Sequence, residues 1–432
     1  MITDPIATTL LIGSFLLLIM LRTPIAFALG ISSVLTAVYM KIPAFIVVQR
    51  MVVGLQSFSL LAIPFFILTG QIMTEGKLAD RLVNLASLFV GRIRGGLAMV
   101  NCVDSMLFGG ISGSAVADVS GLGAIVIPAM QRKGYAKDFS VALTVTTAVQ
   151  AVLIPPSHNM IIYALAAGGA ASIGKLLLAG AVPGVALGIA LMAMCYFMAV
   201  KHNYPREEKH SLREGVKIFR DGILTVGVAV LIMGGIVSGL FTPTESAAVA
   251  VVYALFLTFV IYRDVPFRRI GLILRESVNT IAMVFLLIAT STAFGWMLTV
   301  LNVPAAIGTW LMTISQNKYV LLTLINVFLL FVGMFMDMAP AIIICTPILL
   351  PVATSIGVDP VHFGVILIFN LGIGLCTPPV GNALFVGCAV GKAKIEEILK
   401  PLMLCYIPMI VILFVITFFP GIAMFLPNLL LK

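Results

Sequence analysis

The sequence carries little charge and leaves no polar stretch long enough to form a soluble domain. Asp, Glu, Lys and Arg make up only 10% of the 432 residues, whereas 61% are hydrophobic and the mean hydropathy is +1.17. The longest polar stretch, residues 201–220, has only the length of a loop. This composition excludes an ordinary soluble globular protein and predicts a helical protein that crosses a lipid bilayer many times.

Residues that build disulfides, metal sites and proton relays are also scarce. The six cysteines include no Cys-x-x-Cys pair and lie in or beside apolar segments, so we expect small buried side chains. Four histidines and scattered acids do not form the dense series that a proton relay needs. The net charge of +9 does not indicate nucleic-acid binding, because the positions of the basic residues in loops explain it.

The most informative feature is a short motif that occurs twice, at two breaks in apolar segments. Residues 155–159 and 378–382 both have the pattern Pro-Pro-x-x-Asn, at an offset of 223 positions. The same offset pairs Gly110 with Gly333 and Pro128 with Pro351. Unpaired backbone inside a membrane is tolerated where it lines a cavity, and paired broken helices in two halves indicate a transporter's binding site. The chain is therefore predicted to be an internal duplication with a site at the breaks.

Ten apolar segments have the length of a membrane span, and two longer stretches are interrupted by small or polar residues. We expect the longer stretches, about 97–130 and 319–355, to be re-entrant hairpins whose tips lie at 109–114 and 337–340. The ten expected spans are about 6–21, 24–40, 51–73, 138–167, 176–200, 219–240, 245–262, 276–299, 361–389 and 401–427.

Basic residues predict how these spans are oriented. With the N-terminus outside, most Lys and Arg residues fall in inner loops, as the positive-inside rule requires. The loop after the first hairpin, residues 131–137, is basic and is expected inside, whereas its counterpart, residues 355–360, has no Lys or Arg and is expected outside. Each half has five spans, an odd number, so the second half is expected to be upside down relative to the first.

The predicted architecture is therefore a single all-α transmembrane domain over residues 1–432. It is an inverted repeat of two five-span halves, each with a re-entrant helical hairpin and a broken helix. Residues 1–200 form the first repeat, residues 201–218 a cytoplasmic linker and residues 219–432 the second repeat. Residues 77–95 form an amphipathic stripe suited to the membrane interface, with 304–315 as the outer counterpart. The lack of Lys or Arg before the first apolar run favours a retained span over a cleaved signal peptide.

The hairpin tips and Pro-Pro breaks free backbone carbonyls that have side-chain oxygens beside them. Such oxygens suit a hard monovalent cation such as sodium, and the N-termini of half-helices suit a carboxylate. Alternatively, the hydroxyl groups satisfy the backbone of the broken helices themselves. The candidate oxygen donors are Ser112, Ser114, Ser157 and Asn159 in the first half, and Thr346, Thr377 and Asn382 in the second.

Three acids, Asp104, Asp118 and Asp337, fall within the expected hairpins. Acids inside a membrane are costly, which makes each of them a functional hypothesis. Asp118 and Asp337 either attract the coupling ion or serve as structural acids that cap a helix or form a pair. His158 lies inside the first motif, but its counterpart is Gly381, so His158 either lines the site or fills space.

An enzyme interpretation starts from residues 110–113, which match the Gly-x-Ser-Gly pattern of rhomboid-type intramembrane proteases, with Ser112 as nucleophile and His158 as base. The match is four residues long and explains neither the duplication nor the second hairpin. A catalytic dyad needs one nucleophile in contact with one base, whereas this chain offers two half-sites. We therefore expect a transporter and no enzymatic activity.

Three motifs in order resemble the large permease subunit of TRAP transporters (tripartite ATP-independent periplasmic transporters, the DctM-like family). They are residues 109–118, residues 154–157 and residues 241–245. The resemblance covers essentially the whole chain. It implies a sodium-driven, elevator-type importer of organic acids, such as a C4-dicarboxylate, a keto acid or a sugar acid, in which a transport domain carrying both hairpins moves against a fixed scaffold.

The resemblance also implies where the ligands bind. Sodium is expected at the first hairpin tip and at the second broken helix, and the organic acid beside them. Because neither hairpin offers an obvious Arg, helix N-termini, hydroxyl groups or a basic scaffold residue would bind the carboxylate. The residues expected around the ions are Ser112, Gly113, Ser114, Asn159, Thr346, Thr377, Pro378 and Asn382, and those around the substrate are Ser157, His158, Gly381 and Asn382.

Two protein partners follow from the same resemblance, a small four-helix membrane subunit and a periplasmic solute-binding protein. No cofactor is expected besides Na⁺ as coupling ion. Because no extra spans precede the first one, the chain resembles the unfused form, with the small subunit encoded separately. The expected location is the bacterial inner membrane, with both termini periplasmic. The rival interpretation is a stand-alone sodium/carboxylate symporter that shares this architecture but needs no binding protein.

Overall fold

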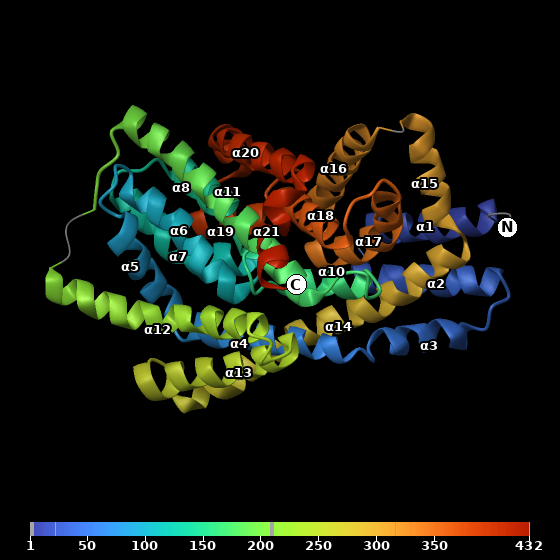
Figure 1. Ribbon diagram of the computed structural model, residues 1–432, viewed down its shortest axis with the longest axis horizontal. Coiled ribbons are helices and arrows are strands. Elements are labelled where there is room, and N and C mark those ends of the chain that lie inside the picture. Colours follow the sequence, from blue (N-terminus) through green and yellow to red (C-terminus); the bar gives the residue numbers. More distant parts are fainter. Residues whose placement is uncertain (1–3, 22, 208–210, 316, 432) are drawn as a thin grey trace.

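The computed structural model describes residues 4–21, 23–207, 211–315 and 317–431, and every regular element in these ranges is a helix. Figure 1 shows the arrangement. The helices of the first half are α1 (Pro5–Met20), α2 (Ile25–Tyr39), α3 (Ala44–Gly54), the 3-10 helix η1 (Phe58–Leu61), α4 (Ala62–Glu75), α5 (Leu78–Val90), α6 (Gly96–Ser112), α7 (Ala115–Arg132), α8 (Lys137–Thr147), α9 (Gln150–Leu153), α10 (His158–Ala166) and α11 (Ile173–His202).

The second half repeats this succession. Its elements are α12 (Leu212–Val237), α13 (Pro243–Leu255), the π-helix η2 (Phe256–Tyr262), the 3-10 helix η3 (Phe267–Arg269), α14 (Ile270–Val300), α15 (Val303–Ile314), α16 (Lys318–Phe335), α17 (Met338–Ser355), α18 (Pro360–Leu375), α19 (Asn382–Gly391), α20 (Ile395–Phe418) and α21 (Pro420–Leu430).

Helix ends follow from the local sequence. Asp359 Oδ1 accepts hydrogen bonds from the N–H groups of Val361 and His362, at 2.8 and 3.3 Å, where α18 begins. Thr242 and Glu245 cap α13 reciprocally: the Glu245 N–H donates to Thr242 Oγ1 at 3.3 Å, and the Thr242 N–H donates to Glu245 Oε2 at 2.7 Å. Proline at the first position of α1, α13 and α18 costs no helical hydrogen bond.

The duplication is visible in the helices themselves. Shifting the bounds of α7 by 223 positions gives those of α17, and the same shift carries α3 and α4 together onto α14. Contacts between the halves occur in reciprocal pairs of repeat counterparts. Helix α7 packs on α19, and their counterparts α17 and α10 pack on each other; α8 packs on α20, and their counterparts α18 and α11 do the same. Such reciprocal contacts arise from a two-fold relation. The inverted orientation of the second half in a membrane stays a prediction.

The helices form two groups. We call α1–α4 and α12–α14 the frame, because α14 packs along α2, α3 and α4, and α13 packs on α4 and α12. The central group comprises α6–α11 and α16–α21. Figure 1 shows the frame along the lower side, from α12 and α13 to α2 and α3, and most of the central group above it. Helix α5 joins the groups, since it packs on both α12 and α6.

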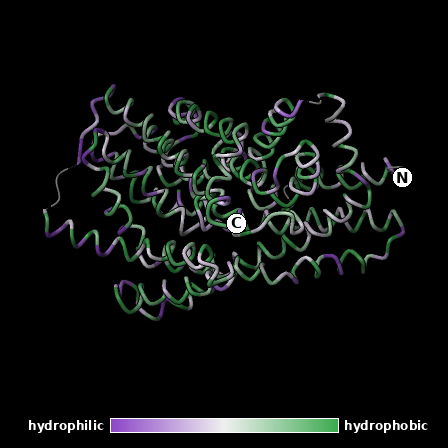
Figure 2. The backbone as a smooth tube through the Cα atoms, viewed as in Figure 1, coloured by the Kyte–Doolittle hydropathy of each residue, from purple (hydrophilic) through white to green (hydrophobic). Residues whose placement is uncertain are grey.

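The outer surface suits a lipid environment. Large apolar side chains are exposed, including Met20 at 82% and Phe197 at 74%, and such a surface in water would favour aggregation. Figure 2 shows hydrophobic residues along most of the chain and hydrophilic ones mainly near helix ends and in loops. Within the described ranges, seven helices are long and apolar enough to span a membrane, or eight spans if the pair 137–153 and 158–166, bent by 52°, counts as one. The chain is thus a multi-pass membrane protein.

Two expected spans are divided in the structure. The segment 51–73 is split between α3, which ends at Gly54, and α4, whose first turn contains Pro64. A Cβ atom at Gly54 would collide with Thr292, so α3 approaches α14 closely there. The segment 401–427 is split at Phe419, before Pro420 begins α21. The connection between the halves is also shorter than expected, because α11 runs to His202 and α12 starts at Leu212.

Candidate functional site

A cavity of about 680 Å³ lies between the frame and the central group. Its walls come from α4 and α14 of the frame, and from α7, α10, α17 and α19 of the central group. We call it the site cavity, because six of the residues expected at the site line it. They are Ser112, Ser114, His158, Asn159, Asp337 and Asn382.

Four helices begin at the site cavity. Ser114 precedes α7, His158 begins α10, Asp337 precedes α17 and Asn382 begins α19. The first turn of a helix has N–H groups without helical partners and carries partial positive charge. No Lys or Arg is among the described residues that line the cavity. The four helix N-termini are therefore its main source of positive potential, and they favour an anion.

The first hairpin tip is joined to the first broken helix by a side-chain hydrogen bond. Gly113 ends α6 with φ of 62°, a conformation that favours glycine. Asn159 Nδ2 donates to the carbonyl oxygen of Gly113 at 3.2 Å, and Asn159 is buried. Ser114 Oγ accepts from the Ala117 N–H at 3.3 Å and so caps α7. The tip and the first Pro-Pro-x-x-Asn motif thus form one unit.

The second hairpin tip is joined to the second broken helix through the backbone. The N–H of Gly381 donates to the carbonyl oxygen of Met334 at 3.2 Å, and φ of Gly381 is 34°. Nearby, Gly333 of α16 and Gly374 of α18 lie so close that a Cβ on Gly374 would overlap the backbone of Gly333. Small residues permit this close crossing of helices. Both Pro-Pro bonds, 155–156 and 378–379, are cis.

Several expected residues lie behind the cavity wall. Ser157 and Thr346 are fully buried, and Pro378 is half-buried next to Thr377. The hydroxyl groups of Thr346 and Thr377 donate to carbonyl oxygens of their own helices, the latter to Ile373 at 2.8 Å. These bonds use the hydroxyl protons and leave the oxygen lone pairs, and ion binding by the two threonines stays a prediction.

The three intramembrane acids have different surroundings. Asp337 is exposed at the site cavity, before the first turn of α17. Asp118 is fully buried and accepts a hydrogen bond from Ser105 Oγ at 2.8 Å, which is a structural contact within the first hairpin. Asp104 is also fully buried, and within the described part of the chain neither of its carboxylate oxygens has a hydrogen-bond partner. Only Asp337 is thus placed to meet a ligand in this cavity.

The frame contributes polar residues that the sequence did not single out. Gln71 and Thr74 of α4 and Thr280 of α14 line the site cavity. Gln71 Nε2 donates to Glu276 Oε2, which ties α4 to α14, and Thr280 Oγ1 donates to the Glu276 carbonyl oxygen at 3.1 Å. These residues stand in continuous helical segments with no break or motif beside them, so no sequence signal marks them.

The protease interpretation requires Ser112 and His158 to be in contact. Ser112 and His158 both line the site cavity. No hydrogen bond joins them among the described contacts, and Ser112 Oγ instead accepts from the Ser114 N–H at 3.4 Å. The arrangement at the tip is therefore that of a loop joining two half-helices.

Comparisons with known proteins cover nearly the whole chain. The family described as "Tripartite ATP-independent periplasmic transporter, DctM component" matches residues 12–422. The sialic acid TRAP transporter large permease protein SiaM of Vibrio cholerae is 42% identical over 89% of this chain and 89% of its own length. The C4-dicarboxylate TRAP transporter large permease protein DctM of Rhodobacter capsulatus is 35% identical over 98% of this chain and 99% of its own.

One solved structure has a similar fold. The YdaH transporter of Alcanivorax borkumensis aligns with a TM-score of 0.64, over 96% of this chain and 98% of its own, at 13% sequence identity. At this identity the likeness concerns the fold alone. It agrees with the expected all-helical polytopic transporter fold.

Proposed function

Because this chain belongs to the DctM family of tripartite ATP-independent periplasmic transporters, where it is a large permease subunit and not an enzyme, we propose that it imports an organic acid together with sodium ions. The observation that carries this proposal is the meeting of four helix N-termini at the site cavity. They offer N–H groups and partial positive charge to a carboxylate without a basic side chain. The cavity, about 680 Å³, has room for a C4-dicarboxylate, a keto acid or a sugar acid.

The proposed sodium sites are the two places where a hairpin tip meets a broken helix. At the first, Ser112, Gly113, Ser114 and Asn159 bring hydroxyl, amide and carbonyl oxygens together. At the second, Thr377, Pro378 and Asn382 stand beside the tip of the other hairpin, with Thr346 in α17. Oxygen ligands of this kind suit sodium. The proposed substrate contacts are Ser157, His158, Gly381 and Asn382, with Asp337 as an acid that attracts the coupling ion.

The division into two groups supports an elevator mechanism, which is part of this proposal. The site cavity lies on the border between the frame and the central group, and both hairpins belong to the central group. Movement of the central group against the frame would therefore carry the whole set of helix N-termini at once.

The proposed complex contains two further proteins, a small four-helix membrane subunit and a periplasmic solute-binding protein. The proposed location is the bacterial inner membrane, with both termini periplasmic. Support comes from membership of the tripartite family, which also disfavours a stand-alone symporter. A symporter without a binding protein would transport free substrate when the chain is reconstituted alone.

The test is uptake by proteoliposomes that contain the chain and its co-encoded small subunit. The probes are radiolabelled sialic acid, succinate and 2,3-diketo-L-gulonate, which represent the substrates named for relatives. Each is added with and without the co-encoded binding protein, under an inward sodium gradient or an equal potassium gradient. We expect uptake of one acid only with sodium and the binding protein. Uptake that is equal in both salts would contradict sodium coupling, and uptake without the binding protein would support the stand-alone alternative.

A further inference from the structure

Asp104 is a buried acid that the proposed ion and substrate contacts leave unused. It is the only charged residue of α6, and its side chain is fully buried. Neither of its carboxylate oxygens has a hydrogen-bond partner among the described residues. An ionised carboxylate without donors in a dry interior is very costly. In this conformation Asp104 therefore needs a bound cation or a proton.

No basic side chain neutralises Asp104 within the described ranges. Of the elements packed on α6, α7 contributes Asp118 and α5 contributes Asp80, and these two acids are the charged groups that act on the Asp104 carboxyl group. Helix α11 places Cys195 opposite Cys102, with 4.0 Å between the sulfur atoms. The other elements packed on α6, which are α4, α8, α9 and α12, add no charged side chain that acts on Asp104.

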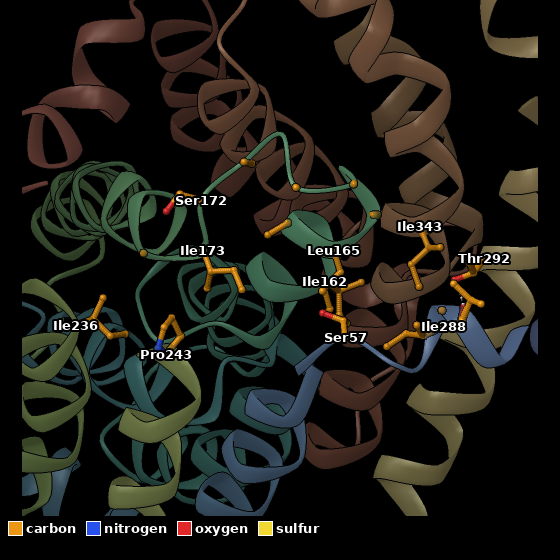
Figure 3. A pocket seen from close by; sticks show the side chains of 18 of the residues that line it. Ser57, Ile162, Leu165, Ser172, Ile173, Ile236, Pro243, Ile288, Thr292 and Ile343 are labelled. Carbon is orange, nitrogen blue, oxygen red and sulfur yellow. Dashed lines mark hydrogen bonds between the residues drawn. The ribbon is translucent and has the colours of Figure 1, made fainter. Parts of the chain in front are cut away.

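The surroundings of Asp104 suit a proton better than a metal ion. Asp104 does not line the site cavity. A second cavity, of about 760 Å³, lies beside the connection from α10 to α11 (Figure 3). The polar side chains among its described lining residues are the hydroxyl groups of Ser57, Ser172 and Thr292, without an acid. Asp104 thus faces neither of these two cavities, and a proton needs no cavity.

The repeat shows that a hairpin of this kind forms without buried acids. At the 223-residue offset, Asp104 corresponds to Val327 and Asp118 to Ala341. Helices α16 and α17 form the same helix pair as α6 and α7 with these apolar residues in place. Acids inside a membrane protein are costly and mark functional positions. The acid at position 104 therefore calls for a role beyond holding the hairpin together.

Polar side chains continue from Asp104 toward the expected inner end of the first hairpin. Asn101 lies about one turn before Asp104, and its Nδ2 donates to Thr144 Oγ1 of α8 at 2.7 Å. Thr144 Oγ1 donates in turn to the Ser140 carbonyl oxygen at 2.9 Å. Asn101, Thr144 and Ser140 are fully buried. Their repeat counterparts are all apolar, namely Leu324, Leu367 and Phe363. Only the first half thus has a polar route between this acid position and the end of its hairpin.

Helix α5 covers Asp104 and is fastened to the frame. Arg81 of α5 forms an ion pair with Asp264, between η2 and η3, at 2.7 Å, and lies 3.7 Å from the centre of the Tyr262 ring. No ion pair joins α5 to α6 among the described residues. In the second half α15 packs on α14 and α17, and Val327 of α16 is 58% exposed. Movement of the central group against the frame would therefore shift α6 against α5 and uncover Asp104.

We infer that Asp104 is a proton-binding site of the central group. Its carboxyl group holds a proton while α5 covers it. When the central group moves, the O–H bond breaks and the proton passes to water at the inner side, which leaves a carboxylate. The carboxylate must regain a proton before α5 covers it again, because it has no partner in the covered state. This exchange step rests on the proposed transport function.

The first measurement needs neither sodium nor substrate. Thermal unfolding of the purified chain with its co-encoded small subunit is recorded in potassium, from about pH 6 to about pH 9, where a free aspartate is ionised. The unmodified protein is compared with Asp104→Asn, which has a similar shape but does not titrate. Because unfolding releases the proton, the unfolding equilibrium constant of the unmodified protein should rise about tenfold per pH unit relative to that of the variant. Stability is thus greatest at low pH and is lost as the pH rises.

Uptake gives the second readout. The proteoliposomes described above are prepared at different internal pH values, and the binding protein added outside selects molecules whose periplasmic side faces outward. Uptake by the unmodified protein should decline as the internal pH rises, by up to about tenfold per unit, because the uncovered carboxylate regains its proton more rarely. Uptake by Asp104→Asn should not change with internal pH and should match that of the unmodified protein at the lowest pH.

Two further variants complete the test. Asp104→Val copies the residue of the second repeat and serves as an independent neutral variant if Asp104→Asn does not fold. The matched control is Asp80→Asn, which removes an exposed acid of α5 and should keep both pH dependences.

The outcomes separate this inference from the proposed function. The same pH dependence of unfolding in the unmodified protein and in the neutral variants would overturn proton binding at Asp104. A difference in unfolding, combined with the same pH dependence of uptake in all variants, would overturn proton exchange during transport. Absence of sodium-driven uptake at every pH would instead overturn the proposed function, and the unfolding comparison would still decide whether Asp104 binds a proton.

Discussion

At the scale of single residues, a few polar groups hold the hairpin tips to the broken helices. Asn159 is the clearest example, because its amide reaches from α10 to the backbone of the first tip. Its counterpart Asn382 lines the same cavity, but the second tip is held by the N–H of Gly381. The two repeats therefore connect the hairpin tip to the broken helix through different groups, and their ion sites need not be chemically equal.

Asn159→Ala should destabilise the protein and impair uptake. The substitution removes the hydrogen bond to Gly113 and leaves a buried carbonyl oxygen without that donor, a loss of about 1–3 kcal/mol. The measurement is thermal unfolding of the purified protein together with uptake. Asn279→Ala, at an exposed position of α14, is the control and should behave like the unmodified chain. Equal stability of the two variants would show that the Asn159 bond does not hold the tip.

Ser114→Ala should weaken sodium activation more than it weakens substrate affinity. Ser114 caps α7 and lines the site cavity. Loss of the cap costs about 1 kcal/mol of stability, and we expect loss of the hydroxyl as an ion ligand to raise the sodium concentration for half-maximal uptake about tenfold, or about 1.4 kcal/mol. Thr377→Ala should shift sodium activation in the same direction. Ser120→Ala, an exposed hydroxyl on the same helix α7, is the control. Unchanged sodium activation in both Ser114→Ala and Thr377→Ala would remove these residues from the ion sites.

At the scale of elements, close helix crossings set the shape of the central group. The crossing of α16 and α18 depends on Gly333 and Gly374, whose backbones touch. In the first half, Gly109 of α6 meets Ala151 of α9, the counterpart of Gly374, in the same way. Each hairpin is thus packed directly against the span that carries the Pro-Pro break, and the two move as a unit in the proposed mechanism.

Gly374→Ala should therefore destabilise the central group. The new methyl group would overlap the backbone of α16, and overpacking of this kind costs about 1–3 kcal/mol. Thermal unfolding and uptake should both decline. The control is Gly271→Ala in α14, where the added methyl group meets no atom within 4 Å and improves helix propensity. A Gly374→Ala protein as stable as Gly271→Ala would mean that the crossing is not tight.

Much of this architecture could be predicted from the sequence, because helix breakers act locally. Small or polar residues that interrupt two long apolar stretches predicted helix pairs at 97–130 and 319–355, where α6–α7 and α16–α17 lie. The division of 51–73 into α3, η1 and α4 was missed, although Gly54, Gln56, Ser57 and Pro64 mark this stretch with small, polar and helix-breaking residues. That these helix pairs re-enter the membrane on one side stays a prediction.

Only the part of the site that lies at the helix breaks could be predicted from the sequence. Residues at the breaks, such as Ser114, His158 and Asn382, were found because the breaks mark them, and the structure brings them to one cavity. Gln71 and Thr280 were missed, since a polar residue in an unbroken helix does not reveal which neighbour it faces. The ion-binding role of Thr377 stays a prediction, and its hydroxyl group donates to the Ile373 carbonyl oxygen.

At the scale of the whole molecule, helix N-termini from both halves meet at one cavity between the frame and the central group. In the proposed mechanism, a shift of the central group along α14 would carry these N-termini and both hairpin tips together. Sodium binding at the two hairpin tips is the premise on which this mechanism rests.

That claim is tested most directly by thermal unfolding of the purified chain with its co-encoded small subunit, in sodium against equal potassium or choline. A ligand that binds only the native state stabilises it by about 2.7 kcal/mol at a hundredfold excess over its dissociation constant. We predict a saturable rise that is specific for sodium, lost in Ser112→Ala and Ser114→Ala and retained in Ser120→Ala. The same unfolding temperature in all three salts would contradict sodium binding at the hairpin tips.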